Sequence, residues 1–249
     1  DQRALIEALH KTGKPVVLNI MAGRPLELDF EIANSDAILY SFHPGTMGGP
    51  AIAQLIFGDE TPSGKTPVTF PKHVGQIPLY YNHNMTGRPA NGREELLHEI
   101  PLKAGQTSLG MTSYWLDCPF APEFPFGYGL SYTTFEYSNM QMPEKLDKDN
   151  ALKVKVTVKN TGKVAGDEVV QLYMHDEIAS VGRPLKELVA FKRVTLNPGE
   201  SKTVELEVPY RSFHMYDKDM NFVVEEGWFE VWLGKDAENV IDTRRVYVK

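Results

Sequence analysis

Leu152-Lys-Val-Lys-Val-Thr-Val158 alternates apolar with polar residues, the period-two pattern of a β-strand with one face in a core and the other in water. Asn160-Thr-Gly162 follows as a turn. Further short apolar or alternating runs are Val169–Tyr173, Val204–Val208, Trp228–Leu233 and Arg245–Val248. Several short strands separated by turn signals predict an antiparallel β-sandwich over residues 138–249.

Residues 1–75 change to alternating helix and strand signals. Apolar runs at 16–21 and 37–42 predict two strands that are buried on both faces, and helical patterns occur at 1–11, 26–33 and 50–57. This order is the unit of a parallel sheet. Two such strands cannot form an independent parallel sheet, so we expect a partial α/β sandwich whose N-terminal part is missing.

Residues 76–137 are rich in proline, glycine and aromatic residues and have no sustained period, which predicts an extended connector. Its aromatic side chains indicate that it is pressed against domain surfaces. The fold class is therefore α/β, a partial parallel-sheet sandwich, followed by an all-β, immunoglobulin-like antiparallel sandwich.

Several segments, taken in their order and spacing, resemble glycoside hydrolase family 3, the β-glucosidase and β-xylosidase family. They include Pro44-Gly-Thr-Met-Gly-Gly-Pro-Ala-Ile-Ala53, Pro62-Ser-Gly-Lys-Thr-Pro-Val-Thr-Phe-Pro71, Gly75-Gln-Ile-Pro-Leu-Tyr-Tyr-Asn-His83 and Gly166-Asp-Glu-Val-Val-Gln-Leu-Tyr173. The most specific is Phe124-Pro-Phe-Gly-Tyr-Gly-Leu-Ser-Tyr-Thr-Thr-Phe135. The resemblance covers essentially the whole chain.

The resemblance implies an N-terminal barrel, an α/β sandwich and a fibronectin III-like domain, of which the barrel has no counterpart here. Retaining glycosidases use two carboxyl groups, a nucleophile and an acid/base. In the family the nucleophilic Asp is a barrel residue, and the acid/base Glu lies in the α/β sandwich before the point where this chain begins. Neither motif occurs in this sequence, so we assign no catalytic residue and expect this chain alone to be inactive.

Ligands of open parallel sheets bind beyond the carboxyl ends of the strands, which nominates Arg24, His43 and Met47 for a substrate rim. Arg24 could bind a sugar or clamp backbone carbonyls, and His43 could line the rim or serve as a structural histidine. Relatives often carry Trp and Glu in place of Phe42 and Met47, which puts roles that depend on those residue types in doubt.

The segment from Tyr80 to Pro89 is dense in groups that suit sugars: aromatic faces, amides, imidazole and guanidinium. The rim candidates in it are Tyr81, Asn82, His83, Asn84 and Arg88. As a rim on the leaving-group side, they would influence which glycoside enters. Packing between domains, with the asparagines serving as turn residues, explains the same composition equally well.

Composition argues against several other functions. The net charge of -7, with no run of Lys or Arg, gives nothing to hold nucleic acid, and no apolar stretch approaches the length of a membrane helix. The histidines lack zinc-site spacing, so neither a metal nor a cofactor is expected. The single cysteine, Cys118, lies in an aromatic setting that favours a packed thiol.

Two questions stay open on the sequence alone. Trp228 and Trp232 share one side of a strand, and either a core or interdomain face or a sugar platform fits that spacing. The chain is either the C-terminal region of a retaining exo-β-glycosidase acting on β-linked glycosides or oligosaccharides, or a non-catalytic module that binds carbohydrate or protein. Export to the periplasm or the exterior follows only from the resemblance.

Overall fold

The computed structural model describes residues 2–90, 92, 95–105 and 112–249. Its contacts divide the chain into two compact units. The first comprises residues 1–60, 68–79 and 88–124, and the second comprises residues 61–67, 80–87 and 125–249. Part of the predicted connector, residues 91, 93–94 and 106–111, lies outside the described residues, as does Asp1 at the start of the first predicted helix.

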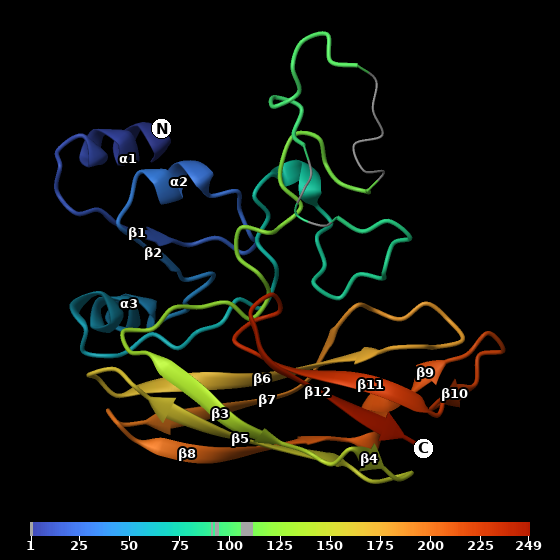
Figure 1. The fold of residues 1–249 in the computed structure, drawn as a ribbon. Coiled ribbons are helices and arrows are strands. Elements are labelled where there is room, and N and C mark those ends of the chain that lie inside the picture. Colours follow the sequence, from blue (N-terminus) through green and yellow to red (C-terminus); the bar gives the residue numbers. More distant parts are fainter. Residues whose placement is uncertain (1, 91, 93–94, 106–111) are drawn as a thin grey trace. The chain divides into compact units, whose positions relative to one another are not determined.

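The first unit is an α/β arrangement around two parallel strands (Figure 1). Its elements are α1 (Gln2–His10), β1 (Val17–Ile20), α2 (Asp29–Ala33), β2 (Ala37–Tyr40), α3 (Gly48–Phe57) and the 3-10 helix η1 (Val74–Gln76). Val17 lies opposite Ala37, and the pairing continues to Ile20 and Tyr40. The predicted order and type of all five main elements are confirmed.

Helix α3 shows how local residue types set its ends. Pro50 lies in the first turn, where its missing N–H group has no intrahelical partner to lose. Gly58 follows the last helical residue with φ of 79°, and its N–H group donates to Gln54 and Leu55 carbonyls. Because that left-handed conformation is costly for other residues, glycine ends the helix there.

The expectation that both strands are buried on both faces is wrong for this chain. Val17 is 51% exposed, and the other residues of β1 and β2 are at most half-buried, apart from exposed Ala37. Phe57 at the end of α3 is 82% exposed. The two apolar strands have the composition of a parallel sheet that is packed on both faces. In this chain, the three helices and the neighbouring strand bury only part of their surface.

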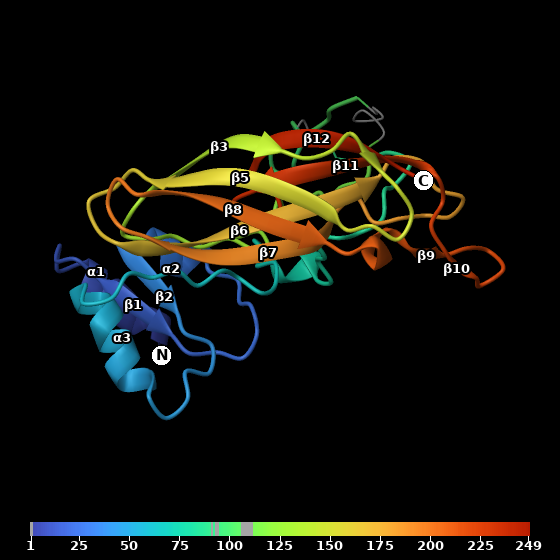
Figure 2. The ribbon, with the colours of Figure 1, turned by 90° about the horizontal axis from the view of Figure 1, so that it is seen from below.

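The second unit is a two-layered antiparallel sandwich, and Figure 2 shows its strands from a second direction. The first sheet has the order β3-β5-β8 and the second β4-β12-β11-β6-β7. The strands are β3 (Phe135–Gln141), β4 (Lys145–Leu146), β5 (Leu152–Asn160), β6 (Gly166–Asp176), β7 (Glu187–Leu196), β8 (Ser201–Val208), β11 (Gly227–Gly234) and β12 (Val240–Val248). A small hairpin pairs β9 (Met215–Tyr216) with β10 (Phe222–Val223), after the 3-10 helix η3 (Tyr210–Phe213).

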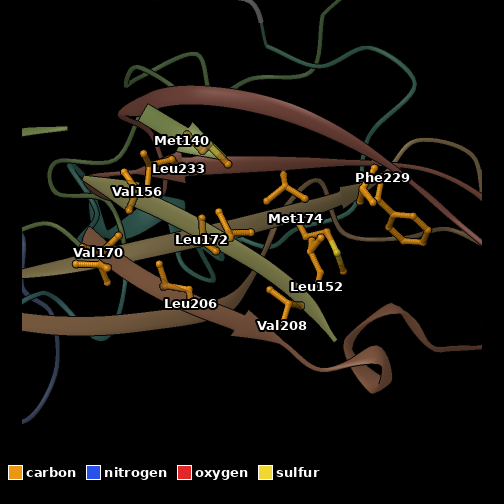
Figure 3. Packing of buried hydrophobic residues seen from close by; sticks show 14 of the residues in the cluster. Met140, Leu152, Val156, Val170, Leu172, Met174, Leu206, Val208, Phe229 and Leu233 are labelled. Carbon is orange, nitrogen blue, oxygen red and sulfur yellow. The ribbon is translucent and has the colours of Figure 1, made fainter. Parts of the chain in front are cut away.

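The core lies between the two sheets, as the close view in Figure 3 shows. Leu152, Val154, Val156 and Val158 of β5 are fully buried, whereas Lys153 and Lys155 between them are exposed. The alternation that opened the sequence analysis is thus the pattern of one core-facing strand. Burial of apolar surface on this scale is the main stabilising contribution to a sandwich.

Two strands are not evident from alternation. Strand β7 carries a register shift opposite Leu172 and Tyr173, so its side chains do not alternate regularly. Strand β3 is mostly polar, and Asn139 within it has φ of 53°, where the pairing with β5 also shifts. Irregular pairing of this kind removes the period-two signal on which strand prediction depends.

Trp228 and Trp232 lie on the same side of β11, but that side is not the core. The residues between them, Phe229 and Val231, are buried, whereas Trp228 is 40% exposed and Trp232 is half-buried. Arg245 lies over the Trp228 ring at 4.7 Å from its centroid, and Trp232 stacks on His175. The core interpretation is therefore wrong.

Candidate functional site

The carboxyl ends of β1 and β2 meet at one edge of the first unit. Ser41, directly after β2, donates a hydrogen bond to the Asn19 Oδ1 in β1, at 2.5 Å. Tyr40, the last residue of β2, donates its hydroxyl to the Arg24 backbone carbonyl, also at 2.5 Å. The loop after β1 is thus tied by side chains to the end of β2. Burial raises the pKa of the Tyr40 hydroxyl.

Four aromatic rings support this edge. Tyr40 contacts Phe42 and Phe70 edge to face, each at 4.9 Å between ring centroids. Phe70 in turn contacts Phe124 at 6.0 Å, and the backbones of Phe70 and Phe124 form an antiparallel bridge. Phe70 is almost completely buried. Residues far apart in the sequence therefore fix the base of the loops that carry Arg24 and His43.

The structure brings the two loops together at Gly23 and His43. A Cβ atom on Gly23 would lie 2.4 Å from the His43 Nε2 atom, so a larger residue there would displace the ring from its present position. The preceding residue, Phe42, has φ of 49°, an uncommon conformation for a bulky side chain. Such outliers concentrate at functional sites, where the surroundings hold them.

Arg24 and His43 are exposed at this edge. Met47, just before α3, is 69% exposed and belongs to the same unit. Arg88 is also exposed in the first unit, where its carbonyl accepts a hydrogen bond from the Ser113 amide at 2.8 Å.

Tyr81, Asn82, His83 and Asn84 lie in the second unit, within residues 80–87, which we name the strap. Tyr81 stacks on Phe126 with ring centroids 4.2 Å apart, and it contacts Tyr173 edge to face. Its hydroxyl accepts a hydrogen bond from the Leu188 amide. The imidazole of His83 is close to the Asn84 carbonyl, with 3.0 Å between Nδ1 and the oxygen.

The strap is attached to the sandwich in the manner of a short extra strand. Asn84 forms an antiparallel bridge with Pro184, and the Leu185 amide donates to the His83 carbonyl at 2.9 Å. Asn82 and Asn84 are exposed, whereas Tyr81 and His83 are half-buried. Tyr81 therefore anchors the strap, and the two asparagines present amide groups to solvent.

A buried charge cluster lies beside this attachment, and sequence reasoning missed it. The Arg183 guanidinium donates to Glu187 at 3.1 Å and lies 3.8 Å from the Asp176 carboxylate. Burial raises the pKa of Asp176, and the neighbouring Arg183 charge opposes that rise. Sequence reasoning could not pair Arg183 with Asp176, because the two residues lie on opposite sides of the connection between β6 and β7 and no local pattern links them.

Two further expectations concern the chemistry of the chain. Within the described ranges, no three His, Cys, Asp or Glu side chains form a group that could hold a metal ion. Cys118 is buried, as its aromatic setting predicts, and burial raises the pKa of its thiol. None of the helices in the described part of the chain is both long and apolar enough to cross a bilayer.

Two known protein families match this chain. Residues 1–132 match the family described as the glycosyl hydrolase family 3 C-terminal domain, and residues 168–237 match the fibronectin type III-like domain. The fold thus defines an α/β region of a glycoside hydrolase followed by a fibronectin-type sandwich. The chain belongs to glycoside hydrolase family 3.

Individual relatives agree with this assignment. The chain is 44% identical to a periplasmic β-glucosidase of Salmonella typhimurium, over 96% of this chain and 30% of that protein. It is 39% identical to a β-xylosidase of Formosa agariphila, over 95% of this chain and 30% of the relative. The crystal structure of a Listeria innocua β-glucosidase in complex with glucose superposes with a TM-score of 0.88 at 40% identity, covering 99% of this chain and 32% of that one. The chain thus spans about a third of the length of these relatives.

Proposed function

We propose that the complete protein is a retaining, exo-acting β-glycosidase that hydrolyses β-glucosides or related β-linked oligosaccharides. The observation that carries the proposal is the family match over residues 1–132, together with relatives named as β-glucosidases and β-xylosidases. A mutant of the Listeria innocua enzyme was crystallised with laminaribiose, a β-linked disaccharide, which supports that class of substrate.

The reaction requires two carboxyl groups on either side of the scissile bond. The sequence of this chain contains neither of the family motifs that carry them. We infer that both lie in another part of the protein, and that the present residues bind and orient the substrate. The proposed rim residues are Arg24, His43, Met47 and Arg88 in the first unit and, taken separately, Tyr81, Asn82, His83 and Asn84 on the strap in the second unit.

Exposed apolar side chains of the first unit support the proposal that another part of the protein packs against it. Leu5 and Leu9 of α1 are exposed on one side of that helix, as are Val17 of β1 and Phe57 of α3. Parallel strands are normally covered on both faces by helices and extended by further strands. We infer that residues 1–75 complete an α/β sandwich begun by an N-terminal region that also contains the barrel.

The same proposal also assigns the two regions of the chain that follow residue 75. Residues 76–137 would be the connector between the α/β sandwich and the fibronectin III-like domain, which would span residues 138–249. A periplasmic or extracellular location is proposed because the Salmonella typhimurium relative is named as periplasmic.

Steady-state kinetics of the complete protein test this function. We expect release of nitrophenol from nitrophenyl β-glucoside or β-xyloside, with little from the matching α-glycosides. Proton NMR of the first product should show the β-anomer, because a retaining mechanism preserves the configuration. Carbohydrate binding without turnover of any β-glycoside would instead favour a non-catalytic binding module.

A further inference from the structure

The strap carries four of the proposed rim residues; besides the packing of Tyr81 on Phe126 and Tyr173, its contacts converge on one short stretch of the sandwich. The bridge from Asn84, the carbonyl of His83 and the hydroxyl of Tyr81 all meet residues 184–188. That stretch is the junction between the β6–β7 connection and the start of β7. Whatever fixes this junction therefore also helps to hold the strap.

The Arg183 side chain links the junction to β6 and β7 through two carboxylates. Only 10% of its side chain is exposed, and its guanidinium lies between Glu187 on β7 and Asp176 at the end of β6. Asp176 is itself 8% exposed. Among the described residues, the Arg183 Nη1 atom has no hydrogen-bond partner, so the guanidinium is held by the Nη2 hydrogen bond to Glu187 and by the charge of Asp176 at 3.8 Å.

Two neighbouring contacts reinforce the same junction. The His175 Nδ1 atom is 3.2 Å from the Pro184 carbonyl oxygen, and the ring of His175 stacks on Trp232. The ammonium group of Lys186 donates to the Ala237 carbonyl at 2.6 Å. These contacts attach the connection to β6 and to the β11–β12 turn. The Arg183 contacts add a link between the end of β6 and the start of β7.

We propose that Arg183 is a positioning residue that sets the strap, and through Tyr81 to Asn84 sets the selectivity for the leaving-group side of the substrate. This inference rests on the proposed function. The β6–β7 connection of the sandwich would then influence which glycosides bind well. Arg183 touches no substrate in this account and acts only through the strap.

The predicted kinetic effect follows from what the strap offers. Tyr81, His83 and the asparagines provide ring faces and hydrogen-bonding groups, and none is assigned a part in bond cleavage. Loss of their alignment should therefore raise KM for substrates with a sugar leaving group and leave kcat little changed. Nitrophenyl β-glucoside, whose leaving group cannot make the same hydroxyl contacts, should be less affected.

The test compares Arg183→Met with unaltered complete protein on laminaribiose and on nitrophenyl β-glucoside. We expect KM for laminaribiose to rise on the order of tenfold, equivalent to the loss of about one good hydrogen bond, with a much smaller rise for the aryl glucoside. The matched control is Arg244→Met, which removes an exposed arginine paired with Asp242 on β12. It should change neither KM.

Amide hydrogen exchange of the complete protein separates positioning from substrate binding. In Arg183→Met, the Leu185 and Leu188 amides, which bond to the strap, should exchange faster than in the unaltered protein or the control. If the methionine variant does not fold, Glu187→Gln weakens the same cluster while keeping the side-chain shape, and the same two readouts apply.

Unchanged exchange of the two amides, or faster exchange with an unchanged ratio of the two KM values, would overturn the inference. In either case the proposed function stands as long as the unaltered protein hydrolyses β-glycosides. Absence of that hydrolysis would refute the proposed function and the selectivity role together, while the exchange data would still report whether Arg183 holds the strap.

Discussion

Gly127 shows in physical terms why one position in the segment Phe124–Phe135 requires glycine. Its φ is 82°, and its carbonyl accepts a hydrogen bond from the Gln171 side chain in β6. A Cβ atom there would lie 2.1 Å from the Gln171 Oε1 atom and 2.8 Å from the Tyr173 hydroxyl. Glycine is required both for its conformation and for the space it leaves.

We expect Gly127→Ala to destabilise the second unit by on the order of 2–5 kcal/mol, because backbone strain adds to overpacking against buried side chains. Gly199→Ala is the matched control. Gly199 has a similar φ of 76°, but a Cβ atom there meets nothing within 4 Å. Urea unfolding measures both variants, and equal losses would show that the contact with Gln171 has no energetic role.

The family resemblance of this segment was visible in the sequence, but its structural role was not. Gly127 and Gln171 are 44 residues apart, and no local pattern links them. The same limit applies to Tyr40, Phe70 and Phe124, whose rings gather under the loops of Arg24 and His43. A sequence shows which residue types are present, whereas contacts between distant residues depend on the complete fold.

At the scale of elements, local pattern was sufficient where pairing is regular. Strand β5 alternates throughout, and the ends of α3 follow from Pro50 and Gly58. Strand β7 has a register shift and could not be predicted from alternation. The strap was predicted as a dense set of sugar-compatible groups, but its bridge to Pro184 could not be predicted, because an isolated bridge has no repeating pattern.

The β6–β7 pair contains a cross-strand charge contact that gives a pH prediction. Asp167 lies opposite Thr195, and it accepts a hydrogen bond from the Arg193 guanidinium at 2.6 Å. The hydrogen bond with Thr195 and the contact with Arg193 hold the pKa of Asp167 below its usual value. A lowered folded-state pKa means that Asp167 stabilises the fold above its unfolded-state pKa, and that this contribution is lost as pH falls through the folded value.

We therefore expect Asp167→Asn to cost about 0.2–1 kcal/mol at neutral pH, a small amount because the Arg193 side chain is 64% exposed to solvent. The difference from the unaltered protein should begin to shrink below about pH 4, the unfolded-state pKa of an aspartate, and should vanish only below the lower folded-state pKa of Asp167. Urea unfolding followed between neutral and acidic pH measures this. A difference that persists at acidic pH would show that the loss comes from packing rather than charge.

At the scale of the whole molecule, the first unit has too little cover for its two parallel strands, and the chain spans about a third of the relatives it matches. Both observations agree with an α/β region that is completed elsewhere. The sandwich, by contrast, has its own core between its two sheets. We infer that the chain contributes substrate contacts and support to an active site whose carboxylates it does not supply.

Nitrophenol release from nitrophenyl β-glucoside, measured side by side for the complete protein and for residues 1–249 alone, tests this central claim most directly. We expect turnover by the complete protein and none above background by residues 1–249, because the nucleophile and the acid/base would be absent. Turnover by the 249-residue chain that survives further purification would show that it holds its own catalytic carboxylates, and would contradict the account.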